Sequence, residues 1–221
     1  PRRGMGAIPA QLCRTLPAGR IHLNAPVDRV EKDALELRDG RRVAGQCVVV
    51  ATDMDAAGQW IPERPSRPWS GTTCVYFDAP APPMERPILA LNGEGRGMIN
   101  NLHVVSQVNP ASAPQGRALI SVTVVGVHPD TGKLERTVEE ELRNWFGPCT
   151  DSWRHLRSYV LPRALPNQRP GVLEPPERPV RTDAGVYACG DHLDQASIQG
   201  ALRSGRRAAE AVIGRPCARP G

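Results

Sequence analysis

Gly190 and Asp191 stand together in the segment GVYACGDHLDQASIQGALRSGRRAAEAVIG. The apolar residues 186–189 before them predict a short strand, and Ser197 is a good N-cap for a helix over residues 198–212. Ligands of open α/β sheets bind where strands end and helices begin. A carboxylate there accepts hydrogen bonds from sugar hydroxyls, and a helix N-terminus offers free N–H groups to an electron-rich atom. The pattern favours a cofactor site, although turns and helix caps use the same residue types.

The predicted helix after Ser197 contains Gly200, Ser204 and Gly205, three residues that lower helix propensity. Small residues inside a helix are typical of a close approach by another part of the structure. We therefore expect a neighbouring segment or ligand to contact this helix closely.

A second glycine pair, Gly4 and Gly6, lies in the opening segment PRRGMGAIPAQL. A dinucleotide-binding fingerprint needs a strand before its first glycine and a third glycine for helix packing. Here only three residues precede Gly4, and Pro9 takes the place of the third glycine. Because apolar residues recur at positions 5, 8, 12 and 16, the segment predicts an amphipathic helix.

Composition limits the classes of protein to which the chain can belong. It has 221 residues, 40% hydrophobic residues and a net charge of +5 that comes almost entirely from arginine. The arginines are scattered and aromatics make up only 4%, which favours a solvated arginine-rich surface over nucleic-acid binding. No apolar run approaches the roughly 20 residues of a membrane span. We expect a soluble globular chain that binds no nucleic acid.

The six cysteines include no C-x-x-C pair, which excludes a zinc knuckle and a thioredoxin-type motif. Cys47 and Cys189 lie in apolar, strand-like runs, where a thiol behaves as a small hydrophobic group. We expect reduced cysteines, no bound metal and a cytoplasmic location.

The first 55 residues predict the opening helix followed by strands. Ile21 and Leu23 alternate with polar residues, and Asp39-Gly40 separates two alternating stretches, which is a hairpin signal. The unbroken apolar run 48–51 predicts a strand in a sheet covered on both faces, and it ends at Thr52-Asp53.

A proline-rich segment at residues 61–71 predicts a crossing between domains, and the sequence pattern changes after it. Strands are predicted there at residues 72–80, 87–95, 97–105 and 117–127, separated by turn residues as in a mostly antiparallel sheet. A helix is predicted over residues 130–147 and a further strand over 154–162. The long proline-rich segment 161–180 predicts a functional or interdomain loop.

The final segment, VYACGDHLDQASIQGALRSGRRAAEAV, resembles the C-terminal flavin motif of the FAD-dependent amine oxidase and phytoene desaturase superfamily. GMGAIPAQLCRTLPAGRIHLNAPVDRVE and VVVATD are similar to stretches on the adenine side of that family's cofactor. The middle, with ELRNWFG and ALPNQRP, is similar to its substrate domain. The resemblance implies an α/β fold: a Rossmann-like FAD/NAD(P)-binding domain, incomplete at its N-terminus, with an inserted α+β substrate domain on a mostly antiparallel sheet.

The same resemblance implies a domain division and a set of FAD contacts. Residues 1–60 and 181–221 form the FAD-binding domain, and residues 61–180 form the substrate-binding domain with its interdomain loops. Asp191 binds the ribityl or pyrophosphate-proximal part of FAD, and Gly190 permits close approach. The N–H groups of Ile198 and Gln199 face the flavin N1/C2 carbonyl region. The implied contacts on the ADP side are Val27, through its backbone to adenine, and Ala51 and Thr52.

The family's N-terminal glycine fingerprint is missing from this sequence. The resemblance therefore implies that the chain is the C-terminal portion of a longer flavoprotein, whose missing N-terminal half is its partner. The fragment alone is expected to bind FAD weakly or not at all. Val27 is equally compatible with an ordinary strand position, because its contact would use only the backbone.

No catalytic acid, base or nucleophile can be assigned from the sequence, because His103, His128, His155 and His192 each lack a partner motif. Flavin chemistry needs none, since the isoalloxazine accepts the hydride. We predict an FAD-dependent oxidoreductase that takes hydride from a small or apolar organic substrate, with Gln168 as a candidate on the substrate side. The alternative is a non-catalytic interaction module that retains the fold. Substrate and electron acceptor stay open.

Overall fold

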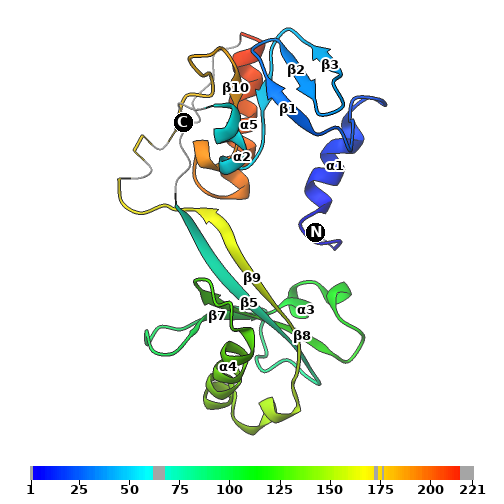
Figure 1. The fold of residues 1–221 in the computed structure, drawn as a ribbon. Helices are drawn as coiled ribbons and strands as arrows, with labels where there is room; N and C mark the ends of the chain where they lie inside the picture. The colour runs from blue at the N-terminus through cyan, green and yellow to red at the C-terminus, as the bar shows by residue number, and fades with distance from the viewer. Residues whose placement is uncertain (1, 62–67, 172–173, 176, 215–221) are drawn as a thin grey trace. The chain divides into compact units, whose positions relative to one another are not determined.

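The computed structural model describes residues 2–61, 68–171, 174–175 and 177–214. The chain divides into two compact units, both of which are shown in Figure 1. The five-stranded unit comprises Pro1–Ile21 and Ser70–Ala164, and the parallel-strand unit comprises His22–Trp69 and Leu165–Gly221. These two units are defined by the contacts within each of them and not by function. The functional domains 1–60, 61–180 and 181–221 therefore stay a prediction.

The five-stranded unit is built on one sheet with the strand order β6-β7-β8-β5-β9. The pairs β6–β7, β7–β8 and β5–β8 are antiparallel, which confirms the predicted character of the sheet. Each predicted strand segment between residues 72 and 162 contains a strand. The strands are β5 Trp69–Ala79, β6 Leu89–Leu91, β7 Ile99–Val104, β8 Ala118–Val125 and β9 Arg154–Pro166.

Helix α4, Thr131–Phe146, covers one face of this sheet. Its buried residues Leu134, Val138 and Leu142 join a core with alternate residues of β5, β7 and β8. The Asp130 side chain caps the helix by accepting from the Lys133 N–H at 3.0 Å, and the helix ends at Gly147. The shorter helices of this unit are α3 Val105–Val108, η1 Pro110–Ser112 and η2 Gly147–Ser152.

Helix α1, Ala7–Thr15, confirms the predicted opening helix. None of its residues is buried, and Met5, Leu12 and Leu16 along the apolar face are about half exposed. Its hydrophobic periodicity is therefore not explained by packing within the residues that the structure describes.

The parallel-strand unit contains two small sheets. Strands β1 Val27–Val30, β2 Ala34–Leu37 and β3 Arg42–Ala44 form an antiparallel meander. The β2–β3 hairpin turns at Asp39-Gly40, as predicted, with Gly40 in the left-handed region at φ 83°. The second sheet pairs β4 Val49–Val50 in parallel with β10 Tyr187–Ala188.

Helices follow both parallel strands. Helix α2, Met54–Trp60, comes after β4, while the short η3, Asp191–Leu193, and then α5, Ile198–Val212, come after β10. A small apolar core joins these elements; its buried members are Val48, Val50, Ala57, Ile61, Val186, Ala188 and Leu193.

The structure corrects three sequence expectations. The run 48–51 is not covered on both faces, because Val49 between the buried Val48 and Val50 is 41% exposed. Ile21 and Leu23 are exposed and lie outside any strand. Strand β9 continues to Pro166, so residues 161–166 belong to a strand, although the sequence predicted that they begin the long loop 161–180.

No helix in the described part of the chain is both long enough and apolar enough to cross a bilayer.

Candidate functional site

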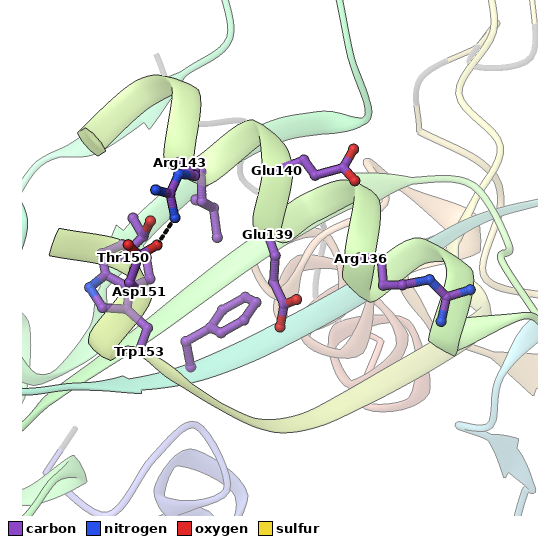
Figure 2. A pocket seen from close by; sticks show the side chains of 9 residues that line it. Arg136, Glu139, Glu140, Arg143, Thr150, Asp151 and Trp153 are labelled. Atoms are coloured by element: carbon purple, nitrogen blue, oxygen red, sulfur yellow. Dashed lines mark hydrogen bonds and ion pairs between the residues drawn. The ribbon is translucent and has the colours of Figure 1, made fainter. Parts of the chain in front are cut away.

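Polar side chains gather in a pocket of about 370 Å³ on the five-stranded unit (Figure 2). Helix α4 contributes Arg136, Glu139, Glu140 and Arg143, and Asp151 lies opposite. Both signs of charge are present, and Arg143 pairs with Asp151. Two arginines stand among three carboxylates, so the charges of the lining are mixed, and their arrangement assigns no particular chemistry.

A different arrangement occurs at the carboxyl ends of β4 and β10. The two strands are parallel and pair Tyr187 with Val49 and Ala188 with Val50. Their following residues, Thr52-Asp53 and Gly190-Asp191, therefore lie at the same edge of the sheet. A Cβ built on Gly190 would lie 3.3 Å from the Thr52 carbonyl oxygen, which confirms that the carboxyl ends of the two strands are adjacent.

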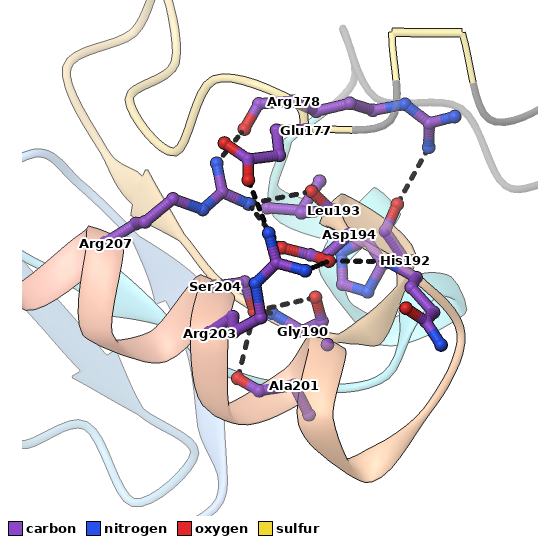
Figure 3. Close-up of polar contacts among 12 residues, drawn as sticks. Glu177, Arg178, Gly190, His192, Leu193, Asp194, Ala201, Arg203, Ser204 and Arg207 are labelled. Carbon is purple, nitrogen blue, oxygen red and sulfur yellow. Dashed lines mark hydrogen bonds and ion pairs between the residues drawn. The ribbon is translucent and has the colours of Figure 1, made fainter. Parts of the chain in front are cut away.

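Gly190 is enclosed by the segment that follows it and by helix α5 (Figure 3). Ser204 holds both backbone groups: its hydroxyl accepts from the Gly190 N–H at 2.9 Å and donates to the Gly190 carbonyl at 2.8 Å. A Cβ at residue 190 would overlap the imidazole of His192, which is buried. Glycine is therefore required here for space.

Helix α5 is approached closely, as its small residues predicted. The partner is the chain's own loop, because a Cβ on Gly200 would overlap the Gln195 carbonyl and Ser204 contacts Gly190. Gly205 has open space around its Cβ position and does not contribute to this contact.

Asp191 is a partly buried carboxyl group beside Asp53. Burial raises the pKa of Asp191, and the nearby negative charge of Asp53 raises it further. Asp53 itself caps helix α2, because its Oδ1 accepts from the Asp55 and Ala56 N–H groups, each at 3.0 Å. The carboxylate of Asp53 is thus already occupied as a helix cap. The ionised carboxylate of Asp191 lacks full solvation, and hydrogen-bond donors of a ligand would stabilise it.

The first turn of α5 presents backbone donors at the same region of the fold. Ser197 caps the helix by accepting from the Gly200 N–H at 3.0 Å, as its sequence position predicted. Ile198 and Gln199 are exposed, and no described residue accepts from their N–H groups. These donors stand at the positive end of the helix dipole of α5.

An ion-pair cluster behind the loop fixes its position, and sequence analysis missed it (Figure 3). The Asp194 side chain is 3% exposed and accepts from Arg207 at 3.3 Å, while Arg203 lies 3.5 Å away. Arg207 also donates to the Leu193 carbonyl at 3.0 Å and to the Arg178 carbonyl at 2.9 Å. No local sequence pattern predicts this ion pair, because the sequence around Asp194 is equally compatible with an exposed aspartate in a turn.

The predicted residues on the other side of β4 lie around a largely apolar pocket of about 300 Å³. Val27, Ala51 and Thr52 all line it, so the structure brings these three predicted residues together. Trp60, which sequence analysis did not single out, also lines it, and its indole N–H donates to the Asp28 carbonyl at 3.4 Å.

Three of the four candidate histidines lie in structural surroundings that the described residues define. His128 Nε2 contacts the Val125 carbonyl at 3.0 Å, and His155 Nε2 lies 3.1 Å from the Ser158 hydroxyl and 3.4 Å from Glu135. His192 is buried under Gly190. Gln168 is exposed after the end of β9. None of these contacts assigns a catalytic residue.

Parallel strands that end in Gly-Asp and Thr-Asp beside a helix N-terminus form the kind of edge at which α/β proteins bind ligands. The model of the flavin-containing amine oxidoreductase family matches residues 1–213. The chain therefore belongs to that flavin-containing family, which confirms the resemblance found in the sequence. No curated protein sequence matches the chain significantly.

Solved structures share the fold at low sequence identity. A putrescine oxidase bound to putrescine has a TM-score of 0.70 at 16% identity, covering 96% of this chain and 53% of its own. A reduced UDP-galactopyranose mutase has a TM-score of 0.64 at 13% identity, with coverages of 95% and 51%. An oxidoreductase from Methanosarcina mazei has a TM-score of 0.63 at 17% identity, with coverages of 84% and 48%. This chain spans about half the length of these structures.

Proposed function

We propose that this chain is the C-terminal portion of an FAD-dependent oxidoreductase that takes hydride from a small or apolar organic substrate. The observation that carries the proposal is the shared edge of β4 and β10, where Gly190, Asp191 and the free N–H groups of α5 stand together. Family membership supports the flavin as the group that binds there.

The residues present fit a flavin dinucleotide. Asp191 accepts hydrogen bonds from ribityl hydroxyls, which offset the incomplete solvation that raises its pKa. The Ile198 and Gln199 N–H groups, with the dipole of α5, would donate to an electron-rich atom of the flavin ring. Bound FAD supplies the hydride acceptor, and the chain positions and polarises it.

We assign the adenine side to the apolar pocket beside β4. Its lining by Val27, Ala51 and Thr52 supports this assignment, because an aromatic base gains from leaving water in such a pocket. Trp60 adds a large apolar surface to the same pocket.

The open edge of β4 supports the proposal that a further portion of polypeptide completes the fold. The Tyr187 and Cys189 N–H groups bond to the Val48 and Val50 carbonyls, each at 2.9 Å. In a parallel ladder alternate residues point to opposite edges, so the Val49 backbone groups face away from β10. Within the described chain no strand pairs with that edge. Parallel sheets are normally larger and covered on both faces, and Val49 is partly exposed.

Flavin binding tests the proposal directly. A longer polypeptide that includes the residues encoded immediately before Pro1 should purify yellow, whereas the 221-residue chain should hold FAD weakly or not at all. Asp191→Ala should bleach the longer protein, because the ribityl acceptor is lost. Asp183→Ala is the matched control, since Asp183 is an exposed turn residue. A colourless longer protein under FAD supplementation contradicts the proposal.

The alternative, a non-catalytic interaction module, predicts that the longer protein keeps its fold without a flavin spectrum. Circular dichroism, measured together with flavin absorbance, separates the two functions.

The cytoplasmic location stays a prediction, which fractionation of the native host tests.

A further inference from the structure

The face of the five-stranded sheet opposite α4 carries a hollow that the proposed cofactor site does not use. Alternation along the strands decides which residues lie there: Val75 and Phe77 are buried in the core under α4, so Tyr76 between them faces the other side. The hollow has a volume of about 520 Å³. Its apolar lining comes mainly from Tyr76, Leu119, Leu156, Tyr159 and Leu161.

Two tyrosines form an aromatic platform in this hollow. The rings of Tyr76 on β5 and Tyr159 on β9 lie 5.8 Å apart and meet edge to face at 89°. Tyr159 is 46% exposed, as are Leu156 and Leu161 to a similar extent. An exposed group of aromatic and aliphatic side chains on a sheet face is suited to an apolar ligand group, because covering it removes apolar surface from water.

One charge stands over this platform. The Arg157 guanidinium lies 5.4 Å from the centre of the Tyr159 ring. Of the described residues that line the hollow, Arg157 alone is charged, and no carboxylate in the described chain pairs with it. Stacking on the ring holds the guanidinium in place while its N–H donors stay available.

Neighbouring charges on the same face do not neutralise Arg157. The nearest acidic group along β5, Asp78, is held by Arg117 at 2.7 Å and Arg154 at 3.1 Å, and their hydrogen bonds lower its pKa. His103 on β7 lies on this face by alternation, and burial lowers its pKa, so it stays neutral at pH 7. The lining of the hollow therefore has one unmatched positive charge, Arg157, beside an apolar surface, and the two arginines on Asp78 leave a net positive charge nearby.

We propose that this hollow binds an apolar or aromatic monocarboxylate, with the apolar group on Tyr76 and Tyr159 and the carboxylate on Arg157. A guanidinium matches a carboxylate in a bidentate geometry. A single cation balances a single negative charge, which favours a carboxylate over a doubly charged phosphate. The identification of this ligand class as the substrate rests on the proposed flavin function, whereas the binding itself does not.

The test uses three probes that share one apolar group: 4-phenylbutyrate, 4-phenylbutan-1-ol and 4-phenylbutylamine. Each is titrated into the 221-residue chain at pH 7 and low salt, and ligand-observed NMR gives the dissociation constants. The carboxylate should bind about tenfold more tightly than the alcohol, the order expected for one charge-assisted hydrogen-bonded contact. The amine should bind more weakly than the alcohol.

Variants locate the contact. Arg157→Gln should reduce 4-phenylbutyrate binding to the level of the alcohol, and Arg157→Lys should keep part of the preference. Tyr159→Leu should weaken all three probes, since it removes the ring and keeps the charge. Arg136→Gln is the matched control, because it removes an arginine of α4 that lines the pocket in Figure 2 instead.

The outcomes separate this inference from the proposed function. Equal binding of carboxylate and alcohol, or an unchanged preference in folded Arg157→Gln, overturns the inference even if the longer protein purifies yellow. Carboxylate preference that depends on Arg157 supports the binding site even if the longer protein is colourless. No detectable binding of any probe also overturns it.

Discussion

The five-stranded unit and the parallel-strand unit are stabilised in different ways. The first buries alternate residues of β5, β7 and β8 under one amphipathic helix, in strands of six to eleven residues. The second has two paired residues in each parallel strand, a small apolar core and a buried polar cluster around Asp194. A regular apolar core stabilises the first unit within the described chain, whereas the second combines a smaller apolar core with specific polar contacts.

Removing a large side chain from the regular core should have the largest effect. Phe77 is fully buried and packs against Trp153 and His155. Phe77→Ala should lower the free energy of unfolding of the five-stranded unit by about 3 to 5 kcal/mol, because it leaves a cavity. Urea unfolding followed by tryptophan fluorescence measures the loss. Tyr76→Ala, on the other face of the same strand, is the control and should cost much less.

Breaking the polar cluster should weaken the parallel-strand unit by nearly as much. Asp194→Ala leaves the buried Arg207 without its carboxylate and should cost about 3 kcal/mol. Hydrogen exchange of residues 177–196 reports the loosened loop. Arg203→Gln is the comparison: that side chain is 47% exposed, so its loss should cost less than about 1 kcal/mol. Equal losses for the two variants contradict the view that burial of the pair decides.

A turn substitution should have a smaller effect on the same unit. Gly40 occupies the left-handed region at φ 83° with open space around its Cβ position. Gly40→Ala should therefore cost about 1 kcal/mol through backbone strain alone. Thermal unfolding measures the shift. Gly205→Ala, at an open helical position, should be neutral or stabilising by comparison.

The smallest expected effect depends on pH. Because the pKa of Asp191 is raised in the fold, its ionisation destabilises the native state; this penalty is absent below the ordinary pKa of 3.8 and grows as pH rises through the raised value. Asp191→Asn should therefore increase stability at pH 7 and leave it unchanged near pH 3. Unfolding curves at both pH values check this. A loss of stability at pH 7 would contradict the assigned burial penalty.

The same contrast explains what the sequence could predict. Helix α4, the Asp39-Gly40 hairpin and the Ser197 cap depend on residues close in sequence, so local patterns were sufficient. Helix α2 was missed although Asp53 is a capping residue with apolar residues at helical spacing after it. Gly58 obscured the signal, because glycine lowers helix propensity.

Long-range features were beyond local patterns. The exposure of Val49 depends on which strands flank β4, and the Asp194–Arg207 pair joins a loop to a helix. For the site, sequence reasoning found Gly190, Asp191 and the start of α5, and it grouped Val27 with Ala51 and Thr52 only through the family resemblance. Trp60 and Arg157 carry no motif, and only their three-dimensional neighbours draw attention to them.

The pairing of β4 with β10 also sets an order of events on the ribosome. The strands of the five-stranded unit are all synthesised by Pro166, so its sheet is able to form while translation continues. Residue 49 must wait for residue 187 before the parallel pair closes. During that interval the edge of β4 that pairs with β10 is open, and it exposes unpaired backbone N–H and C=O groups in the nascent chain.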